Sequence, residues 1–315
     1  MTLTTQEIKA EVDNTLEKTD FRIGKKYSGK VRDNYILKDK RIFIATDRIS
    51  CFDRIIGTVP FKGQVLNQLA AYWFDATKDI IKNHIIEVPD PNVTVVHECE
   101  PFPIEVVVRG YLTGSLWREY EKGVREIYGL KLLDNMSKNE RFSDPIITPT
   151  TKAKSGHDMP ISKEEIIKQG ICSTELWDEV ELKALELFSR GTELLAERNL
   201  LLVDTKYEFG FIDGELVLMD EIHTPDSSRF WYKDSYFTLF RENKEQKSMD
   251  KEYVRQWLLK RGFSGDGEIP KLTDGVKVEA ARRYIEIFEQ ITGMAFKRQE
   301  GQILARIENN LKGLT

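Results

Sequence analysis

The stretch from Leu201 to Glu221 constrains the fold more than any other part of the chain, because its residues alternate in character. Bulky side chains occupy the odd positions Val203, Tyr207 and Phe209, and charged side chains occupy the even positions between them. Successive strand residues point to opposite faces of a sheet, so this pattern predicts a strand with one core face and one charged face. An apolar run follows the Asp213-Gly214 pair, which predicts a β-hairpin.

The register of this hairpin decides which polar groups meet. A two-residue turn at Asp213-Gly214 places Glu208 and Asp220 on opposite faces. A three-residue turn, 212–214, puts glycine at the left-handed bulge position and brings Lys206, Glu208 and Asp220 onto one face. We predict the three-residue turn, because it also gathers the apolar residues of both strands on the core side. Those apolar residues are Phe209, Phe211, Val217 and Met219.

Two carboxylates and a lysine on one rigid sheet face suit Mg²⁺ with a polyphosphate. Mg²⁺ takes hard oxygen ligands, usually one or two carboxylates with phosphate oxygens and water, and lysine supplies a point charge to a phosphate. Glu208 and Asp220 are therefore candidate metal ligands, and with Lys206 they are the candidate catalytic residues. A solvated charged face on an ordinary hairpin explains this stretch, taken alone, equally well.

Two segments before the hairpin carry groups that suit anions. Lys30 and Arg32 follow Gly29, which allows close backbone approach, and both point the same way from a strand. An exposed basic strand is the simpler interpretation of that segment. Farther on, an apolar strand ends at Arg109 and leads into a helix that begins near Ser115. Free N–H groups, a hydroxyl and an arginine make an anion site there, although an ordinary helix cap has the same residues.

One segment after the hairpin, 220–231, has similar chemistry. It holds Asp226, two serines and Arg229 in a loop that Pro225 restrains. An arginine can bind a carboxylate or phosphate through two parallel hydrogen bonds. A structural loop with a capped turn is the alternative.

The remaining pattern predicts an α+β protein with two lobes and the chemistry in the cleft between them. A hairpin at 26–46, a helix at 64–80 and strands at 84–88, 93–98 and 104–109 predict a β-rich N-terminal lobe, residues 1–103. An α/β C-terminal lobe, residues 104–315, is expected to hold the 201–221 hairpin and several helices. Segment 144–160 is rich in Pro, Thr, Ser, Lys and Gly, which predicts a long surface loop. The C-terminal helices are predicted at 113–122, 162–168, 173–198, 250–261 and 276–291.

Composition excludes several classes of protein. The net charge of -5 over 315 residues argues against a global basic surface for nucleic acid, so phosphate should be bound locally by a few placed cations. Three scattered cysteines and four separated histidines indicate neither a disulfide framework nor a zinc site. The start of the chain lacks an apolar signal segment, and no run of about 18 apolar residues occurs. We expect a cytoplasmic protein, monomeric or a small homo-oligomer, with small-molecule substrates and neither membrane nor nucleic-acid partners.

Together these segments resemble the phosphoribosylaminoimidazole-succinocarboxamide synthase (SAICAR synthetase) family. The resemblance implies an ATP- and Mg²⁺-dependent ligase of purine biosynthesis. Such an enzyme joins L-aspartate to 5-amino-1-(5-phospho-D-ribosyl)imidazole-4-carboxylate, through an acyl phosphate, and releases ADP and phosphate. It also implies a kinase-like or ATP-grasp-like nucleotide cleft. The likeness is carried, in family order, by 28–32, 45–53, 108–115, 204–210 and 220–231, and it is weakest in the C-terminal helices.

The resemblance also implies roles for single residues. Glu208 and Asp220 would hold Mg²⁺, and the backbone of Glu105–Val108 would meet adenine. The implied ATP-binding residues are Lys30, Val31, Arg32, Glu105, Val107 and Lys206. The implied substrate-binding residues are Arg109, Ser115 and Arg229 for the ribonucleotide phosphate and Asp226 near the imidazole. Further candidates are Asp47, Arg48, Ser50 and the loop Lys152–Asp158, which is expected to close over substrate.

Two rival functions use the same cleft. A small-molecule kinase would need no aspartate, and a nucleotide-binding module without catalysis would tolerate loss of a metal carboxylate. Ligation through an acyl phosphate requires no protein nucleophile, so positioning and charge neutralisation would supply the catalysis.

Overall fold

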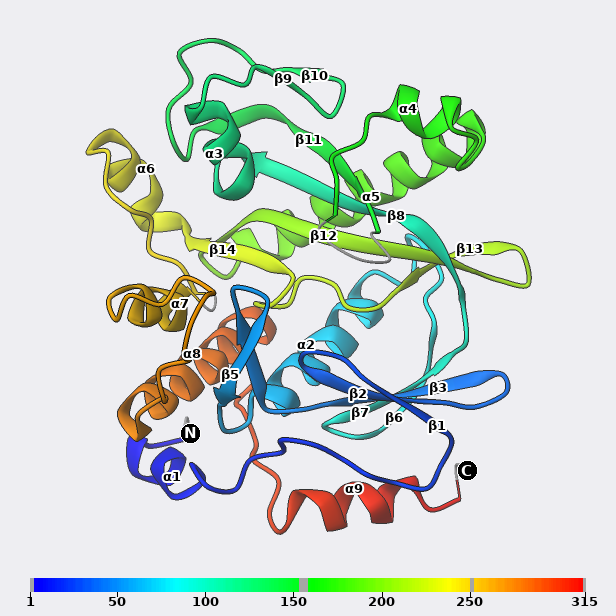
Figure 1. The fold of residues 1–315 in the computed structure, drawn as a ribbon, viewed down its shortest axis with the longest axis vertical. Helices are drawn as coiled ribbons and strands as arrows, with labels where there is room; N and C mark the ends of the chain where they lie inside the picture. The colour runs from blue at the N-terminus through cyan, green and yellow to red at the C-terminus, as the bar shows by residue number, and fades with distance from the viewer. Residues whose placement is uncertain (1–2, 153–157, 250–251, 314–315) are drawn as a thin grey trace.

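Two antiparallel five-stranded sheets, one in each half of the molecule, organise the fold (Figure 1). The computed structural model describes residues 3–152, 158–249 and 252–313. The first sheet has the order β1-β2-β3-β7-β6, and the second has the order β11-β8-β12-β13 with β14 also paired to β12. The predicted α+β class with two lobes is confirmed. The strands of the first sheet are β1 (Lys25–Ser28), β2 (Arg32–Ile36), β3 (Lys40–Ala45), β6 (Ile85–Asp90) and β7 (Val93–His97).

The first sheet has two different faces, because its strand residues alternate. Tyr35, Ile42 and Val95 are buried on one face against α9 (Ile303–Leu311) and the segment around Leu16. On the other face, a cavity lies between the sheet and α2 (Lys62–Ala76). Its walls include Arg32, Phe43, Ala45 and Thr94 of the sheet and Leu66, Asn67 and Ala70 of α2.

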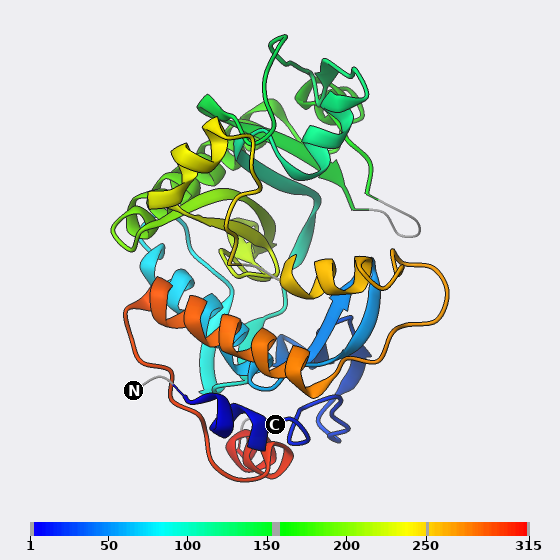
Figure 2. The same cartoon turned by 90° about the vertical axis from the view of Figure 1, so that its left-hand side faces the viewer.

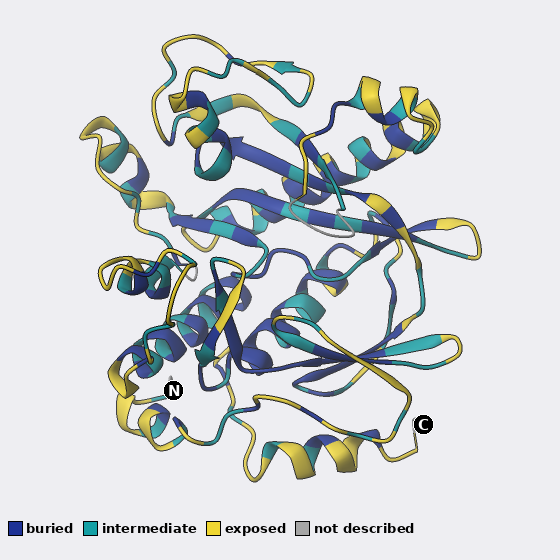
Figure 3. Cartoon of the chain, viewed as in Figure 1, coloured by how far each residue is buried: buried dark blue, intermediate teal, exposed yellow. Residues whose placement is uncertain are grey.

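The second sheet places its charged residues on one side and its core on the other, as the alternation predicts. Tyr207 and Phe209 are fully buried, together with Val106 and Val108 of the neighbouring strand. The long helix α5 (Thr174–Ala196) packs against β12 and β8. Figure 3 shows the central strands of this sheet largely buried and the tip of the β12–β13 hairpin exposed. The strands are β8 (Glu100–Tyr111), β11 (Arg141–Thr151), β12 (Leu200–Ile212), β13 (Glu215–Met219) and β14 (Ser228–Tyr232).

The predicted three-residue hairpin turn is wrong. Ile212 pairs with Glu215, and Glu208 pairs with Met219, so the turn has two residues. Asp213 and Gly214 have φ angles of 52° and 81°. Positive φ at both positions is the type I′ geometry that Asp-Gly favours, because its twist matches that of the flanking strands.

The predicted surface loop at 144–160 is also wrong over its first half. Residues up to Thr151 belong to β11, which pairs with β8 through Ile146↔Arg109 and Thr148↔Val107. Pro145 and Pro149 are tolerated because β11 is the edge strand of its sheet, where a missing N–H need not break a ladder. The remainder, 152–160, includes residues 153–157 outside the described part of the chain.

The C-terminal helices pack onto elements from the start of the chain. Helix α8 (Asp274–Thr292) contacts α1 (Thr5–Ala10) and α2 (Lys62–Ala76), and α9 contacts β6. Figures 1 and 2 show α8 and α9 in the same half of the molecule as the first sheet. The predicted division at residue 103 stays a prediction, and these contacts favour grouping α8 and α9 with the first sheet.

Most predicted helices are present with shifted ends, and α6 and α9 had no counterpart in the prediction. The predicted helix 250–261 corresponds to α7, and its first two residues lie outside the described part of the chain. Within the described ranges, no helix is long and apolar enough to cross a membrane. The other elements are α3 (Gly114–Glu121), α4 (Lys163–Lys168), α6 (Lys233–Arg241), α7 (Glu252–Leu259) and the strand pairs β4 (Arg48–Cys51) with β5 (Arg54–Thr58) and β9 (Glu126–Ile127) with β10 (Leu130–Lys131).

Candidate active site

The register of the second sheet builds the charged face. Glu208 lies opposite Glu105, and Lys206 lies opposite Val107. Asp204 lies opposite Arg109 on one side and opposite Arg229 on the other. Paired residues of antiparallel strands share a face, so three strands bring these side chains together.

Lys206 is the centre of a network of ion pairs on this face. Its Nζ atom lies 2.7 Å from Oε1 of Glu105 and 2.6 Å from Oε1 of Glu208, and Lys152 also pairs with Glu208. Burial alone would raise the pKa of Glu208, but Lys206 and Lys152 outweigh it and lower this pKa to about 2. For Lys206 the directions are reversed: burial alone would lower its pKa, but the carboxylates of Glu208 and Glu105 outweigh burial and raise it. Near neutral pH both side chains are therefore charged.

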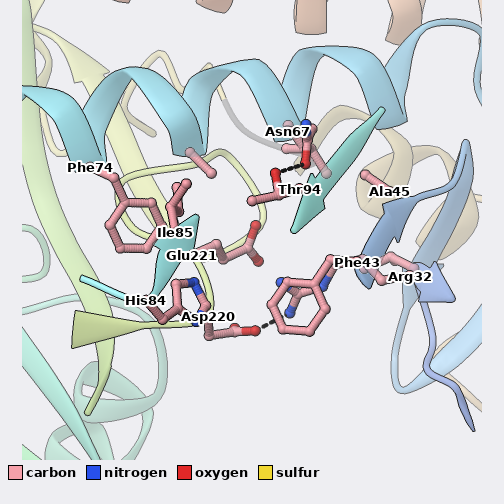
Figure 4. A pocket seen from close by; sticks show the side chains of 13 residues that line it. Arg32, Phe43, Ala45, Asn67, Phe74, His84, Ile85, Thr94, Asp220 and Glu221 are labelled. Atoms are coloured by element: carbon pink, nitrogen blue, oxygen red, sulfur yellow. Dashed lines mark hydrogen bonds and ion pairs between the residues drawn. The ribbon is translucent and has the colours of Figure 1, made fainter. Parts of the chain in front are cut away.

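Asp220 reaches the cleft by a route that strand alternation does not predict. It follows the last residue of β13 and has a φ angle of 68°, which turns the chain out of the strand. Its carboxylate accepts a hydrogen bond from Arg32 of the first sheet, so this pair connects the two halves of the molecule. Figure 4 shows the pair, with the Glu221 carboxylate directed into the cavity beside it. Burial raises the pKa of Glu221, and the charge of Arg32 offsets part of that rise.

The 28–32 segment forms a tight turn at the end of β1, in which the Gly29 N–H donates to the Arg32 carbonyl. Lys30 is exposed and pairs with Asp53, and Val31 lines the same cavity as Arg32.

The candidate substrate contacts Asp47 and Arg48 are buried and hold the backbone. Asp47 accepts hydrogen bonds from the N–H groups of Leu16 and Gly63, and Arg48 pairs with Asp33. Ser50 is half-buried in β4. The contacts of Asp47 and Arg48 support a structural role for this segment.

The predicted anion residues meet in one pocket. Arg109 donates from Nε to Thr148, from Nη1 to Asp204 and from Nη2 to Ser115, at 2.9, 3.1 and 3.2 Å. Arg229 pairs with the same Asp204 carboxylate. A cavity of about 260 Å³ is lined by all of these residues except Thr148, and also by Val107, Lys206 and Asp226. The proposed nucleotide lysine and the proposed phosphate arginines therefore share one cavity.

Several residues of this region were not predicted as site residues. Asp204 bridges Arg109 and Arg229, and its alternation with Lys206 on one face was the available signal. Arg118 and Arg255 line a neighbouring cavity with Arg229, and they come from α3 and α7. Burial first, and then the nearby arginines, lower the pKa of Arg118. Three arginines therefore lie together beside the pocket, and Glu121, Glu245 and Glu252 line the same cavity.

The expected contact between adenine and the backbone of Glu105–Val108 stays a prediction. These residues pair with β11 on one side and with β12 on the other, so their backbone groups are used within the sheet. The Glu105 side chain still lies in the cleft, and burial raises its pKa while Lys206 offsets part of the rise.

The donor set suits a metal that shares its ligands with phosphate. In the described ranges, no three His, Cys, Asp or Glu side chains form a metal-binding group by themselves. Glu208 and Asp220 supply hard oxygen atoms, and both are already matched with cations. This fits Mg²⁺ with a nucleotide, because Mg²⁺ usually combines one or two carboxylates with phosphate oxygens and water.

Fold and site together define an α+β protein with a cleft between two lobes that is suited to bind phosphate groups. The family model for SAICAR synthetase matches residues 25–271. The phosphoribosylaminoimidazole-succinocarboxamide synthase of Bacteroides thetaiotaomicron is 53% identical over 305 residues, which cover 94% of this chain and 97% of that relative. The chain therefore belongs to the SAICAR synthetase family and is an ATP-dependent carbon–nitrogen ligase.

Solved structures agree with this assignment. The SAICAR synthase of Saccharomyces cerevisiae, complexed with SAICAR, superposes with a TM-score of 0.80 at 31% identity, covering 90% of this chain and 100% of that one. A SAICAR synthetase in complex with ADP superposes with a TM-score of 0.67 at 26% identity, covering 87% of this chain and 100% of that one.

Proposed function

We propose that this chain joins L-aspartate to the carboxylate of 5-amino-1-(5-phospho-D-ribosyl)imidazole-4-carboxylate, with ATP as the energy source, in the cleft between its two sheets. The shared cavity carries the proposal, because Lys206 lines it together with Arg109 and Arg229. A lysine that contacts the ATP phosphates and a pocket that binds a phosphate ester can thus act on one bound ribonucleotide.

ATP is proposed to lie between the first sheet and the charged face of the second. Lys30 and Arg32 would meet its phosphates from the first sheet, and Lys206 would meet them from the second. Glu208 and Asp220 would hold Mg²⁺, which neutralises phosphate charge when bound. Asp220 forms an ion pair with Arg32, and Glu208 forms one with Lys152. These ion pairs support the proposed role, because they show that each carboxylate lies where a cation can be bound.

The reaction is proposed to proceed in two steps. First, a carboxylate oxygen of the ribonucleotide takes the γ-phosphoryl group of ATP, and ADP leaves. Then the amine of aspartate attacks the acyl carbon, loses a proton, and the bond to phosphate breaks to give the amide. Lys206 and Arg32 stabilise the charge that moves between oxygen atoms, and Arg109, Ser115 and Arg229 hold the ribonucleotide by its own phosphate.

The test compares two aspartates of the same hairpin. Asp220→Asn should abolish ADP release that depends on all three substrates, at saturating Mg²⁺, while leaving the melting temperature nearly unchanged. Asp213→Asn is the matched control, because Asp213 is exposed at the hairpin tip and asparagine tolerates its positive φ. The control should keep full activity. Full activity of Asp220→Asn would sink the proposed role of this carboxylate.

A further inference from the structure

A buried lysine lies at the start of α2 and pairs with Asp226, which lines the cavity of Arg109 and Arg229. Lys62 is the first residue of the helix and is fully buried. An unpaired ammonium in such a place is strongly unfavourable, so its partner is informative. The Nζ atom of Lys62 donates to Oδ2 of Asp226 at 2.9 Å.

The C-terminal helix α8 supplies a second partner for the same carboxylate. The hydroxyl of Tyr284 donates to Oδ1 of Asp226 at 2.9 Å, and Tyr284 is 4% exposed. Lys62 also lies 5.6 Å from the centre of the Tyr284 ring, so the three side chains form one cluster. Each oxygen of Asp226 is thus held by a donor from a different helix.

This clamped carboxylate lines the cavity that contains Arg109 and Arg229. A carboxylate has about four lone-pair positions, so Asp226 can accept hydrogen bonds from Lys62 and Tyr284 and from a substrate N–H together. Hydrogen bonds to charged groups are directional and among the stronger ones in proteins. Two of them fix the plane of the carboxylate relative to the pocket.

We propose that Lys62 and Tyr284 are positioning residues that orient Asp226 toward the imidazole end of the ribonucleotide. Helix α8 thereby takes part in substrate recognition, although it lies outside the segments that carry the family likeness. The inference rests on the proposed function, because it assumes that Asp226 contacts the ribonucleotide.

Tyr284→Phe tests this with the smallest change, since it removes one hydroxyl and keeps the ring. We expect the dissociation constant of the ribonucleotide, measured by calorimetry, to rise about tenfold, because a hydrogen bond to a charged group is lost. The KM for ATP should stay within about twofold, because the nucleotide does not depend on Asp226.

A double-mutant cycle separates positioning from a structural effect. In an Asp226→Asn background, Tyr284→Phe should weaken ribonucleotide binding by less than about twofold, because the hydroxyl then has no carboxylate to orient. An equal tenfold effect in both backgrounds would overturn the proposal. So would unchanged ribonucleotide binding in the single variant.

Tyr207→Phe is the matched control. Tyr207 is a buried tyrosine whose hydroxyl bonds to Nε2 of His223 at 2.6 Å, on the core side of the second sheet. It should lose thermal stability and keep its ribonucleotide affinity. Lys62→Met is less informative alone, because removing one partner of a buried ion pair can unfold the chain. If the wild-type chain shows no aspartate-dependent ligation, the proposed function fails. If the wild-type chain ligates aspartate and Tyr284→Phe binds the ribonucleotide as tightly as the wild type, this inference alone fails.

Discussion

Replacing Arg109 by lysine tests the phosphate pocket most sharply, because the charge stays while the geometry is lost. The guanidinium group now contacts Thr148, Asp204 and Ser115 through three different nitrogen atoms. A lysine ammonium is a single point on a flexible stem and cannot hold three such neighbours and a phosphate in one plane.

The size of the effect follows from those contacts. Loss of one charge-assisted hydrogen bond costs about 1.5–3 kcal/mol. Loss of the two that Arg109 donates to the pocket residues Asp204 and Ser115 should therefore cost about 3 kcal/mol or more. That corresponds to a fall on the order of 100-fold in kcat/KM for the ribonucleotide. The assay is steady-state ADP release at varied ribonucleotide, with ATP and aspartate saturating.

Arg190→Lys is the matched control for this substitution. Arg190 makes a two-point contact with Asp79, at 3.1 and 2.8 Å, and also reaches a backbone carbonyl, but it lies on α5 away from the cleft. Its kcat/KM should equal that of the wild type. An Arg109→Lys enzyme that is folded and has a wild-type KM for the ribonucleotide would refute the assignment of the phosphate pocket.

Two further predictions concern backbone and pH. Gly114 has a φ angle of 61°, and a Cβ atom there would lie 2.5 Å from the Arg229 guanidinium, so Gly114→Ala should raise the ribonucleotide KM at least tenfold. Gly170→Ala, with a similar φ and open space around it, should leave that KM unchanged; equal KM values for the two variants would contradict the argument.

Burial holds the pKa values of His84 and His223 at about 3, below the ordinary 6.5. The contribution of these two histidines to the free energy of unfolding is therefore fully present above pH 6.5 and is lost as the pH falls toward 3. Burial raises the pKa of Asp47 from 3.8 to about 6, which acts in the opposite sense but is the smaller shift. Urea unfolding should therefore show a loss on the order of 2 kcal/mol between pH 7 and pH 5, and an unchanged midpoint would count against it.

The alternation of the 201–221 segment was enough to predict a charged face and a core face, but not the register. Strand β13 is apolar on both sides, because Val217 on one side is buried, as are Leu216 and Leu218 on the other. Either register therefore buries bulky residues, and the preference of Asp-Gly for a two-residue turn decides the outcome. Asp220 rejoins the charged residues through a positive φ, which no strand periodicity can reveal.

The sequence also did not indicate which strand lies at the edge of a sheet or which strands flank a given strand. Polar residues and two prolines made β11 resemble a loop, because an edge strand needs only one set of backbone hydrogen bonds. The family resemblance implies that the backbone of β8 meets adenine, and the apolar run of this strand does not show that two strands flank it.

Site residues were predictable where residue type and strand phase agree, as for Lys206, Glu208 and Arg109. Asp204 carries the same signal. Lys62 carried no signal, because a lysine at the start of a helix is ordinarily exposed, and only the tertiary contact with Asp226 shows its importance.

The most direct test of the central claim is ADP release from the wild-type chain with each substrate omitted in turn. Ligation through an acyl phosphate predicts sustained ADP release, and an amide product of matching amount, only when ATP, L-aspartate and the imidazole ribonucleotide are all present. Sustained ADP release without aspartate, accompanied by a stable phosphorylated ribonucleotide, would identify a kinase and contradict the account.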